Sequence, residues 1–241
     1  SGVAIVNQLL FVFNLCIFGA VSGPGIFTAQ FHGARDDEGI RHTFRFKLMI
    51  CGMIATVGIC LFAFASEPLI SLYLKGEGTP EDIAATLSYG KEYLKIMLWG
   101  LVPFALTNIY SGTLRETGET MVPMTGGIAA VLVNLFFNYV LIFGHFGLPA
   151  MGVKGAAVAT VISRYVELAI VAGWTHLNSA KKPFIRGAYR SLAIPGALTK
   201  KLIVKGLPLL VNEALWSAGM AMMNQCYSLR GLEVVAAYNI S

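Results

Sequence analysis

A single carboxylate lies inside a long uncharged stretch near the end of the sequence. Glu213 precedes the run 214–229, which contains no Asp, Glu, Lys or Arg, and no basic residue lies within one helical turn of it. Hydrocarbon disfavours the charged form of a buried carboxyl group, so an unpaired one holds its proton tightly. An ion-coupling site needs a group that binds and releases H⁺ or Na⁺. Glu213 is therefore the first candidate for such a site, and the alternative is a glutamate neutralised by a neighbouring helix.

Further polar residues share helical faces with one another. In a helix, Ser217 and Asn224 lie on the same face as Glu213, at offsets of four and eleven residues. Asn134 and Asn138 are four residues apart and also share a face. Two carboxamides on one face can supply oxygens to a cation, or they can hydrogen-bond to a neighbouring helix. The residues themselves leave both interpretations of this pair open.

Two opposite charges occur together in another apolar stretch. Arg164 and Glu167 are three residues apart, so they meet on one face of a helix. A lone charge is costly in apolar surroundings. We interpret the two residues as a structural ion pair in which each charge neutralises the other.

The first apolar stretch carries polar residues and a predicted bend. Asn7 and Asn14 lie two turns apart on one face, and Gln30 lies near the end of the stretch. Such a face indicates that the helix borders a protein interior or a cavity. Pro24 is flanked by two glycines, and proline removes a backbone hydrogen bond, so we expect a kink or hinge there. The residues assigned to a substrate cavity or to gating are Asn7, Asn14, Gln30, Pro24, Ser217 and Asn224.

The elements that must position these residues are membrane-spanning helices. Hydrophobic residues make up 56% of the sequence and charged residues only 13%, whereas soluble domains contain about 25% charged residues. Uncharged, mostly apolar runs of about 18 residues are long enough to cross the ~30 Å hydrocarbon core as helices. We predict an all-α, polytopic transmembrane bundle. Its six predicted spans are about Gly2–Phe31, Phe44–Ser66, Tyr89–Leu114, Thr120–Phe143, Gly155–Leu177 and Leu202–Leu229.

Basic residues are distributed unevenly between the connecting loops. Twelve fall on one side of the predicted bundle and five on the other. Lys and Arg are retained preferentially in the cytoplasm. We therefore place the basic loops 32–47 and 178–205 in the cytoplasm, and the loops around Gly76–Glu81 and His145–Met151 outside. The net charge of +5 then reflects topology in a plasma membrane and not nucleic-acid binding.

Motifs for enzymatic chemistry do not occur in the sequence. The four cysteines lie in apolar runs without metal-ligand spacing, and there is no His-Glu-x-x-His pair or phosphate loop. A membrane-embedded transferase, the least favoured alternative, needs clustered carboxylates or a His/Asp pair. We expect no enzyme activity, no cofactor and no metal beyond a bound Na⁺. The expected partners are the lipid bilayer and a small, cationic, amphipathic substrate.

Several motifs occur in an order typical of one transporter family. Leu114-Arg115-Glu116-Thr117-Gly118 links two predicted spans, Asn134-x-x-x-Asn138-Tyr follows, and Gly155-Ala-Ala-x-Ala-Thr160 comes next. With these motifs the sequence resembles the multidrug and toxic compound extrusion (MATE) family over essentially its whole length. The resemblance implies twelve helices in two six-helix lobes arranged as a V. It also implies export of drugs and toxic organic compounds by antiport with Na⁺ or H⁺.

The resemblance also implies a division of the sequence. Residues 1–177 match most of the N-terminal lobe without its first helix, 178–201 match a basic cytoplasmic inter-lobe loop, and 202–241 match helix seven and the start of helix eight. Both ends lie in apolar segments. We therefore expect a piece of a longer transporter that is monomeric at full length.

Site residues follow from the same resemblance. Asn134, Asn138 and Thr160 match positions around the coupling-ion site of the N-terminal lobe. Glu213 matches an acidic position of the cation site in the C-terminal lobe. The alternative function within the same superfamily is a lipid-linked oligosaccharide flippase. Such proteins tend to have a strongly cationic cavity. Here Arg164 is the one basic residue deep in a predicted span, which disfavours the flippase alternative.

Overall fold

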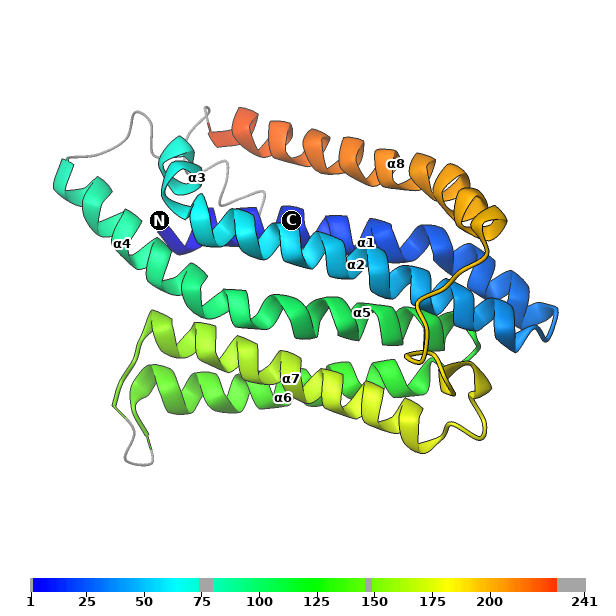
Figure 1. Ribbon diagram of the computed structural model, residues 1–241. Coiled ribbons are helices and arrows are strands. Elements are labelled where there is room, and N and C mark those ends of the chain that lie inside the picture. The colour runs from blue at the N-terminus through cyan, green and yellow to red at the C-terminus, as the bar shows by residue number, and fades with distance from the viewer. Residues whose placement is uncertain (1, 74–79, 146–148, 229–241) are drawn as a thin grey trace.

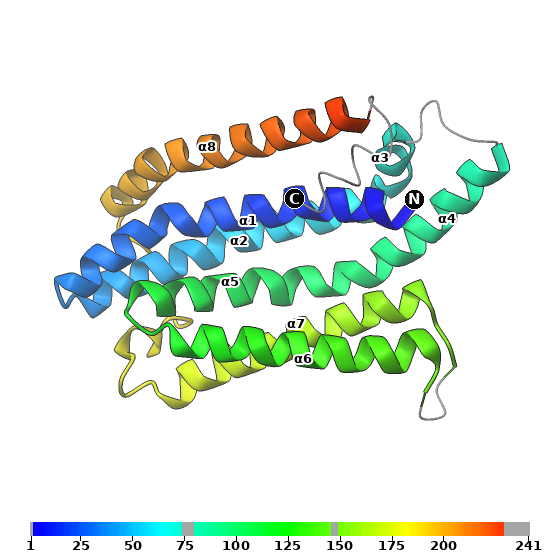
Figure 2. The ribbon, with the colours of Figure 1, turned by 180° about the vertical axis from the view of Figure 1, so that it is seen from behind.

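Long helices that run side by side make up the protein (Figures 1 and 2). The computed structural model describes residues 2–73, 80–145 and 149–228. Within these ranges the chain forms helices and no strand, which confirms the predicted all-α fold. The helices are α1 (Gly2–Gly33), α2 (Asp37–Phe64), α3 (Ser66–Tyr73), α4 (Pro80–Met97), α5 (Leu101–Glu116), α6 (Met121–Phe143), α7 (Val153–Leu177) and α8 (Gly196–Ser228), with 3₁₀ turns at Leu98–Gly100 and Pro183–Ile185.

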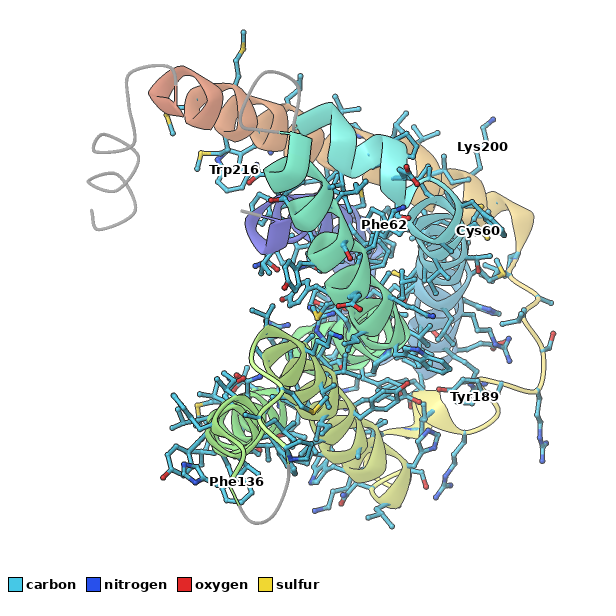
Figure 3. All side chains as sticks on the ribbon, turned by 90° about the vertical axis from the view of Figure 1, so that its left-hand side faces the viewer. Cys60, Phe62, Phe136, Tyr189, Lys200 and Trp216 are labelled. Atoms are coloured by element: carbon cyan, nitrogen blue, oxygen red, sulfur yellow. The ribbon has the colours of Figure 1, made fainter. Side chains whose placement is uncertain are left out.

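Five helical segments are long and apolar enough to cross a membrane. They coincide with the first five predicted spans. The sixth predicted span overlaps α8, which is not one of the five found among the described residues. Apolar side chains such as Val131 and Leu135 are about two-thirds exposed on the outer face of α6, where Figure 3 also shows Phe136. Such surfaces suit lipid, because soluble proteins rarely expose large apolar patches. The segments are Ile5–Gly33, Asp37–Phe64, Thr86–Glu116, Met121–Phe143 and Val153–Leu177.

The predicted loop 32–47 is mostly helical, which corrects the prediction. The helix α2 begins at Asp37, and the side chain of Asp36 accepts a hydrogen bond from the backbone N–H of Gly39 at 2.9 Å. An aspartate at this position satisfies a free helical N–H, and acidic residues in the first turn suit the helix dipole. Arg45 and Lys47 therefore lie on α2 and are buried. The predicted loop 178–205 is likewise shorter, because α8 begins at Gly196.

The helix α1 continues through Pro24 without interruption. A hydroxyl hydrogen bond from Thr28 to the carbonyl of Pro24, at 3.1 Å, supports the backbone beside the proline. The two flanking glycines permit close packing, which explains their presence. A Cβ at Gly23 would come within 2.8 Å of the Cα of Gly206 on α8, and a Cβ at Gly25 would overlap the carboxylate of Glu116. The helix is therefore not broken at Pro24, and the flanking glycines serve helix packing. The predicted kink or hinge stays a prediction.

The helices pack in successive layers around one apolar core. Figures 1 and 2 show α6 and α7 paired on one side of α5, with α1 and α2 on its other side and α8 lying along α1 beyond them. The core contains fully buried side chains from α1, α2 and α5, among them Ile17, Phe44 and Leu114. This arrangement places polar residues of α5, α6 and α7 next to one another.

Candidate functional site

Polar side chains of α6 and α7 form a hydrogen-bonded cluster. The amide of Asn138 donates to Oδ1 of Asn134 at 2.9 Å, and the amide of Asn134 donates to Oγ1 of Thr160 at 3.3 Å. The one-turn spacing of the asparagines puts both on the face of α6 that meets α7. Gly155 lets the helices approach closely, because a Cβ there would lie 2.7 Å from the carbonyl oxygen of Leu141. The structure thus brings together the three residues that the resemblance assigned to an ion site.

This cluster is not fully satisfied. The hydroxyl of Thr160 donates to the carbonyl of Ala156 in its own helix at 2.9 Å. Oδ1 of Asn138 is buried and has no hydrogen-bond partner within the described part of the chain. A buried acceptor without a partner costs about 1–3 kcal/mol. A cation or a hydrogen-bond donor that bound at Oδ1 of Asn138 would supply the missing interaction.

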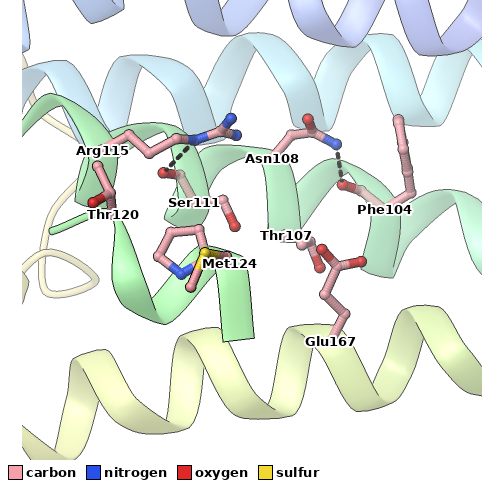
Figure 4. A pocket seen from close by; sticks show the side chains of 9 residues that line it. Phe104, Thr107, Asn108, Ser111, Arg115, Thr120, Met124 and Glu167 are labelled. Atoms are coloured by element: carbon pink, nitrogen blue, oxygen red, sulfur yellow. Dashed lines mark hydrogen bonds between the residues drawn. The ribbon is translucent and has the colours of Figure 1, made fainter. Parts of the chain in front are cut away.

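A second polar feature is a cavity of about 360 Å³ between α5, α6 and α7 (Figure 4). The hydroxyls of Thr107 and Ser111 are buried beside it and have no partner among the residues that the structure describes. The amide of Asn108 donates to the carbonyl of Phe104 at 2.9 Å, in its own helix. The cavity is lined by Phe104, Thr107, Asn108, Ser111, Arg115, Thr120, Pro123, Met124 and Glu167.

Sequence reasoning missed the α5 side of this cavity. Thr107, Asn108, Ser111 and Arg115 recur at spacings of three and four residues, so one face of α5 carries them all. That periodicity is visible in the sequence. It was overlooked because none of these residues forms a recognisable motif and the predicted span ended before Arg115.

The predicted ion pair between Arg164 and Glu167 is not a direct contact, which corrects the interpretation. The guanidinium of Arg164 donates to the carbonyl of Gly100 at 3.1 Å and lies 4.8 Å from the ring centroid of Phe104. Four salt bridges occur among the described residues, and neither residue takes part in them. Glu167 instead lines the cavity. The backbone carbonyl at the 3₁₀ turn draws the guanidinium away from the carboxylate.

The predicted cavity residues of α1 are dispersed. Asn7 accepts a hydrogen bond from the hydroxyl of Tyr93 on α4 at 3.2 Å. Oδ1 of Asn14 is buried and has no partner within the described ranges. Pro24 is buried and Gln30 is exposed. The structure does not gather these four residues into one site.

Three predicted residues belong to α8. Glu213, Ser217 and Asn224 lie within the helix, but their side chains fall outside the described part of the structure. Their assignment therefore stays a prediction.

The fold and the polar clusters between its spans define a multi-pass helical membrane protein. The MatE family model matches residues 1–140. A Thermotoga maritima protein described as "Probable multidrug resistance protein NorM" is 30% identical over 241 residues, which is 100% of this chain and 49% of that relative. The chain therefore belongs to the MatE family. It spans about half the length of the curated relatives it matches.

Other known proteins agree with this assignment. "Multidrug resistance protein PmpM" of Pseudomonas aeruginosa is 27% identical over 220 residues, covering 90% of this chain and 45% of that protein. A MATE-family transporter solved in an outward-facing conformation superposes with a TM-score of 0.77 at 22% identity, over 98% of this chain and 50% of the other. An inward-facing structure gives 0.76 at 20% identity, over 98% and 51%. The fold of this chain thus fits both conformations about equally well.

Proposed function

We propose that the full-length protein is a secondary active transporter that exports drugs or other toxic organic compounds from the cell in exchange for Na⁺ or H⁺. The observation that carries the proposal is the incompletely satisfied cluster of Asn134, Asn138 and Thr160 between two membrane-length helices. Polar groups inside membrane helices are costly and commonly mark ion or substrate pathways. The multidrug resistance names of the relatives support the same activity.

The position of Arg164 argues against the flippase alternative. Its guanidinium donates to the carbonyl of Gly100 and lies over the ring of Phe104. That charge is therefore engaged within the protein and is not a free cationic wall for a lipid-linked phosphate.

Dye efflux by the full-length protein in proteoliposomes tests the proposal, with Na⁺ and pH gradients imposed separately. We expect one of the two gradients to drive efflux, and efflux that is indifferent to both gradients would refute ion coupling.

Asn138→Leu and Glu213→Gln are each expected to abolish gradient-driven efflux while leaving membrane insertion intact. Asn178→Leu is the matched control, because that carboxamide lies beyond the opposite end of α7 and, among the described residues, donates only to the carbonyl of Trp174. Wild-type efflux by Glu213→Gln would show that its assignment is wrong.

A further inference from the structure

The segment between α7 and α8 is docked onto the helical bundle. We refer to residues 178–193 as the strap. Phe184, Ile185 and Ala188 of the strap are almost completely buried, and the ring of Phe184 lies 5.7 Å from that of Phe44 on α2. Connecting segments usually run over the surface with their side chains in solvent. The strap is therefore unusual, since it contributes side chains to the core of the bundle.

Two arginines of α2 hold the backbone of the strap. Arg45 donates from Nε to the carbonyl of Ala188 at 2.9 Å, from Nη2 to that of Gly187 at 2.8 Å and from Nη1 to that of Ala193 at 3.2 Å. Arg41, one turn earlier, donates to the carbonyls of Phe184 at 3.2 Å and Pro183 at 3.4 Å. A planar guanidinium with several fixed donors suits such multiple contacts. Five carbonyls between residues 183 and 193 are thus bound by two side chains.

Contacts with α5, α7 and the α5–α6 turn complete the docking. Lys182 donates to the carbonyl of Thr117 at 3.2 Å. The phenol of Tyr189 hydrogen-bonds to Tyr110 of α5, and its ring stacks on His176 of α7 with centroids 5.9 Å apart. The strap is consequently fixed to several elements of the bundle at once.

Within the described structure, the segment that connects the strap to α8 is no longer hydrogen-bonded to the bundle after Ala193. Ala193 is the last strap residue whose carbonyl is held by Arg45. Residues 191–195 have no regular secondary structure and are largely exposed, and α8 starts at Gly196. Only Ile194 and Pro195 therefore separate the last anchored carbonyl from the helix. Beyond them, α8 crosses α1 at Gly206 and Gly23, where no side chain intervenes.

We propose that Arg41 and Arg45 are positioning residues that hold the strap rigidly against the α1–α7 bundle. Any reorientation of α8 during transport then occurs about Ile194 and Pro195 and not at the end of α7. This inference rests on the proposed transport function. It assigns to the arginine pair the task of setting where the pivot lies.

Distance measurements between spin labels test the pivot in the full-length, cysteine-free transporter. One pair, Met121→Cys with Arg190→Cys, joins the bundle to the strap. The other, Met121→Cys with Lys201→Cys, joins the bundle to α8. All three positions are exposed. Between low and high pH, and with and without ethidium, the first distance is expected to stay narrow and constant while the second shifts. A first distance that shifts together with the second would overturn the proposal.

Variants of the arginines sharpen the test. Arg41→Gln with Arg45→Gln is expected to broaden the bundle–strap distance and to lower turnover by roughly tenfold, with the Kd for ethidium unchanged within about twofold. Arg45→Lys keeps the charge but has one donor atom, so it should not restore turnover. The matched control is Arg186→Gln, which removes an exposed strap charge whose side chain makes no hydrogen bond within the described residues. A narrow bundle–strap distance in the double variant would refute the role of the pair.

An insertion variant keeps the test decisive if the arginine substitutions prevent folding. Two glycines inserted after Ala193 lengthen the pivot and leave every arginine contact in place. We expect an unchanged bundle–strap distance and a broader bundle–α8 distance, and the opposite pattern would contradict the proposal. Because these distances need no efflux, a failure of transport itself is distinguishable from a failure of this inference.

Discussion

The strap region and the α5–α7 polar region contain similar polar groups but differ in how completely those groups are paired. On α2, Arg45 engages three carbonyls of the strap, and the buried ammonium of Lys47, two residues further on, contacts both Glu116 and Thr113 of α5. Between α5, α6 and α7, acceptors and hydroxyls such as those of Asn138 and Ser111 are buried without partners in the described structure. Complete pairing gives rigidity, whereas incomplete pairing leaves groups free to meet a ligand. The comparison therefore assigns a structural role to the strap region and ligand binding to the α5–α7 polar region.

The largest effect is expected from breaking the buried ion pair between α2 and α5. The side chain of Lys47 is fully buried and that of Glu116 is 18% exposed. Glu116→Ala should lower the free energy of unfolding by about 3–5 kcal/mol, because it leaves an uncompensated buried charge. The double variant Lys47→Met, Glu116→Gln should recover most of the loss. Unfolding of the full-length protein in mixed micelles measures the free energy of unfolding of both variants. An unchanged value for Glu116→Ala would show that the charge of Lys47 is solvated.

A smaller effect is expected where α1 crosses α8. Gly23→Ala would place a Cβ 2.8 Å from the Cα of Gly206, whereas the reciprocal Gly206→Ala would place one 3.7 Å from the Cα of Gly23. Overpacking against backbone costs about 1–3 kcal/mol. Gly23→Ala should therefore lower stability by that amount and Gly206→Ala should not. Equal losses in the same unfolding assay would mean that the crossing is set by something other than contact at Gly23.

Two threonines of α5 compare a paired hydroxyl with an unpaired one directly. The hydroxyl of Thr113 accepts a hydrogen bond from Lys47 at 3.2 Å, whereas that of Thr107 is buried without a described partner. Thr113→Val should cost about 1–2 kcal/mol of stability, since it removes a partner of a buried charge. Thr107→Val removes an unsatisfied group of similar shape and should be neutral or slightly stabilising. A greater loss for Thr107→Val would indicate that its hydroxyl is already bound.

The smallest effect concerns how the free energy of unfolding depends on pH through Lys182 of the strap. Desolvation lowers the pKa of Lys182 below its usual value of 10.5, and Glu119 partly opposes the shift. Between the lowered folded value and 10.5 the unfolded chain binds more protons, so stability should rise with pH across that window. Lys182→Gln should flatten this slope in unfolding curves measured at several pH values. A slope that is unchanged in the variant would assign the dependence to another group.

The sequence predicted the spans well because continuous apolar runs leave few alternatives to helices. It misplaced the start of α2, although Asp36, Asp37 and Glu38 are a recognisable helix beginning. The cluster of Asn134 and Asn138 was visible from spacing, but the missing partner at Oδ1 of Asn138 depends on three-dimensional packing. The strap was unpredictable for a different reason. Arg41 and Arg45 bind backbone carbonyls, which every residue possesses, so no pattern of side chains reveals their partners.

The same feature has an evolutionary consequence. Because the guanidinium groups of Arg41 and Arg45 contact main-chain oxygens, substitutions at the exposed positions between residues 183 and 193 leave those contacts intact. Insertions and deletions within that stretch are different, since they shift every later carbonyl out of reach. Among homologues we therefore expect the exposed positions of the stretch to vary in composition and the buried positions 184, 185 and 188 to stay apolar. The length of the stretch should hardly vary at all.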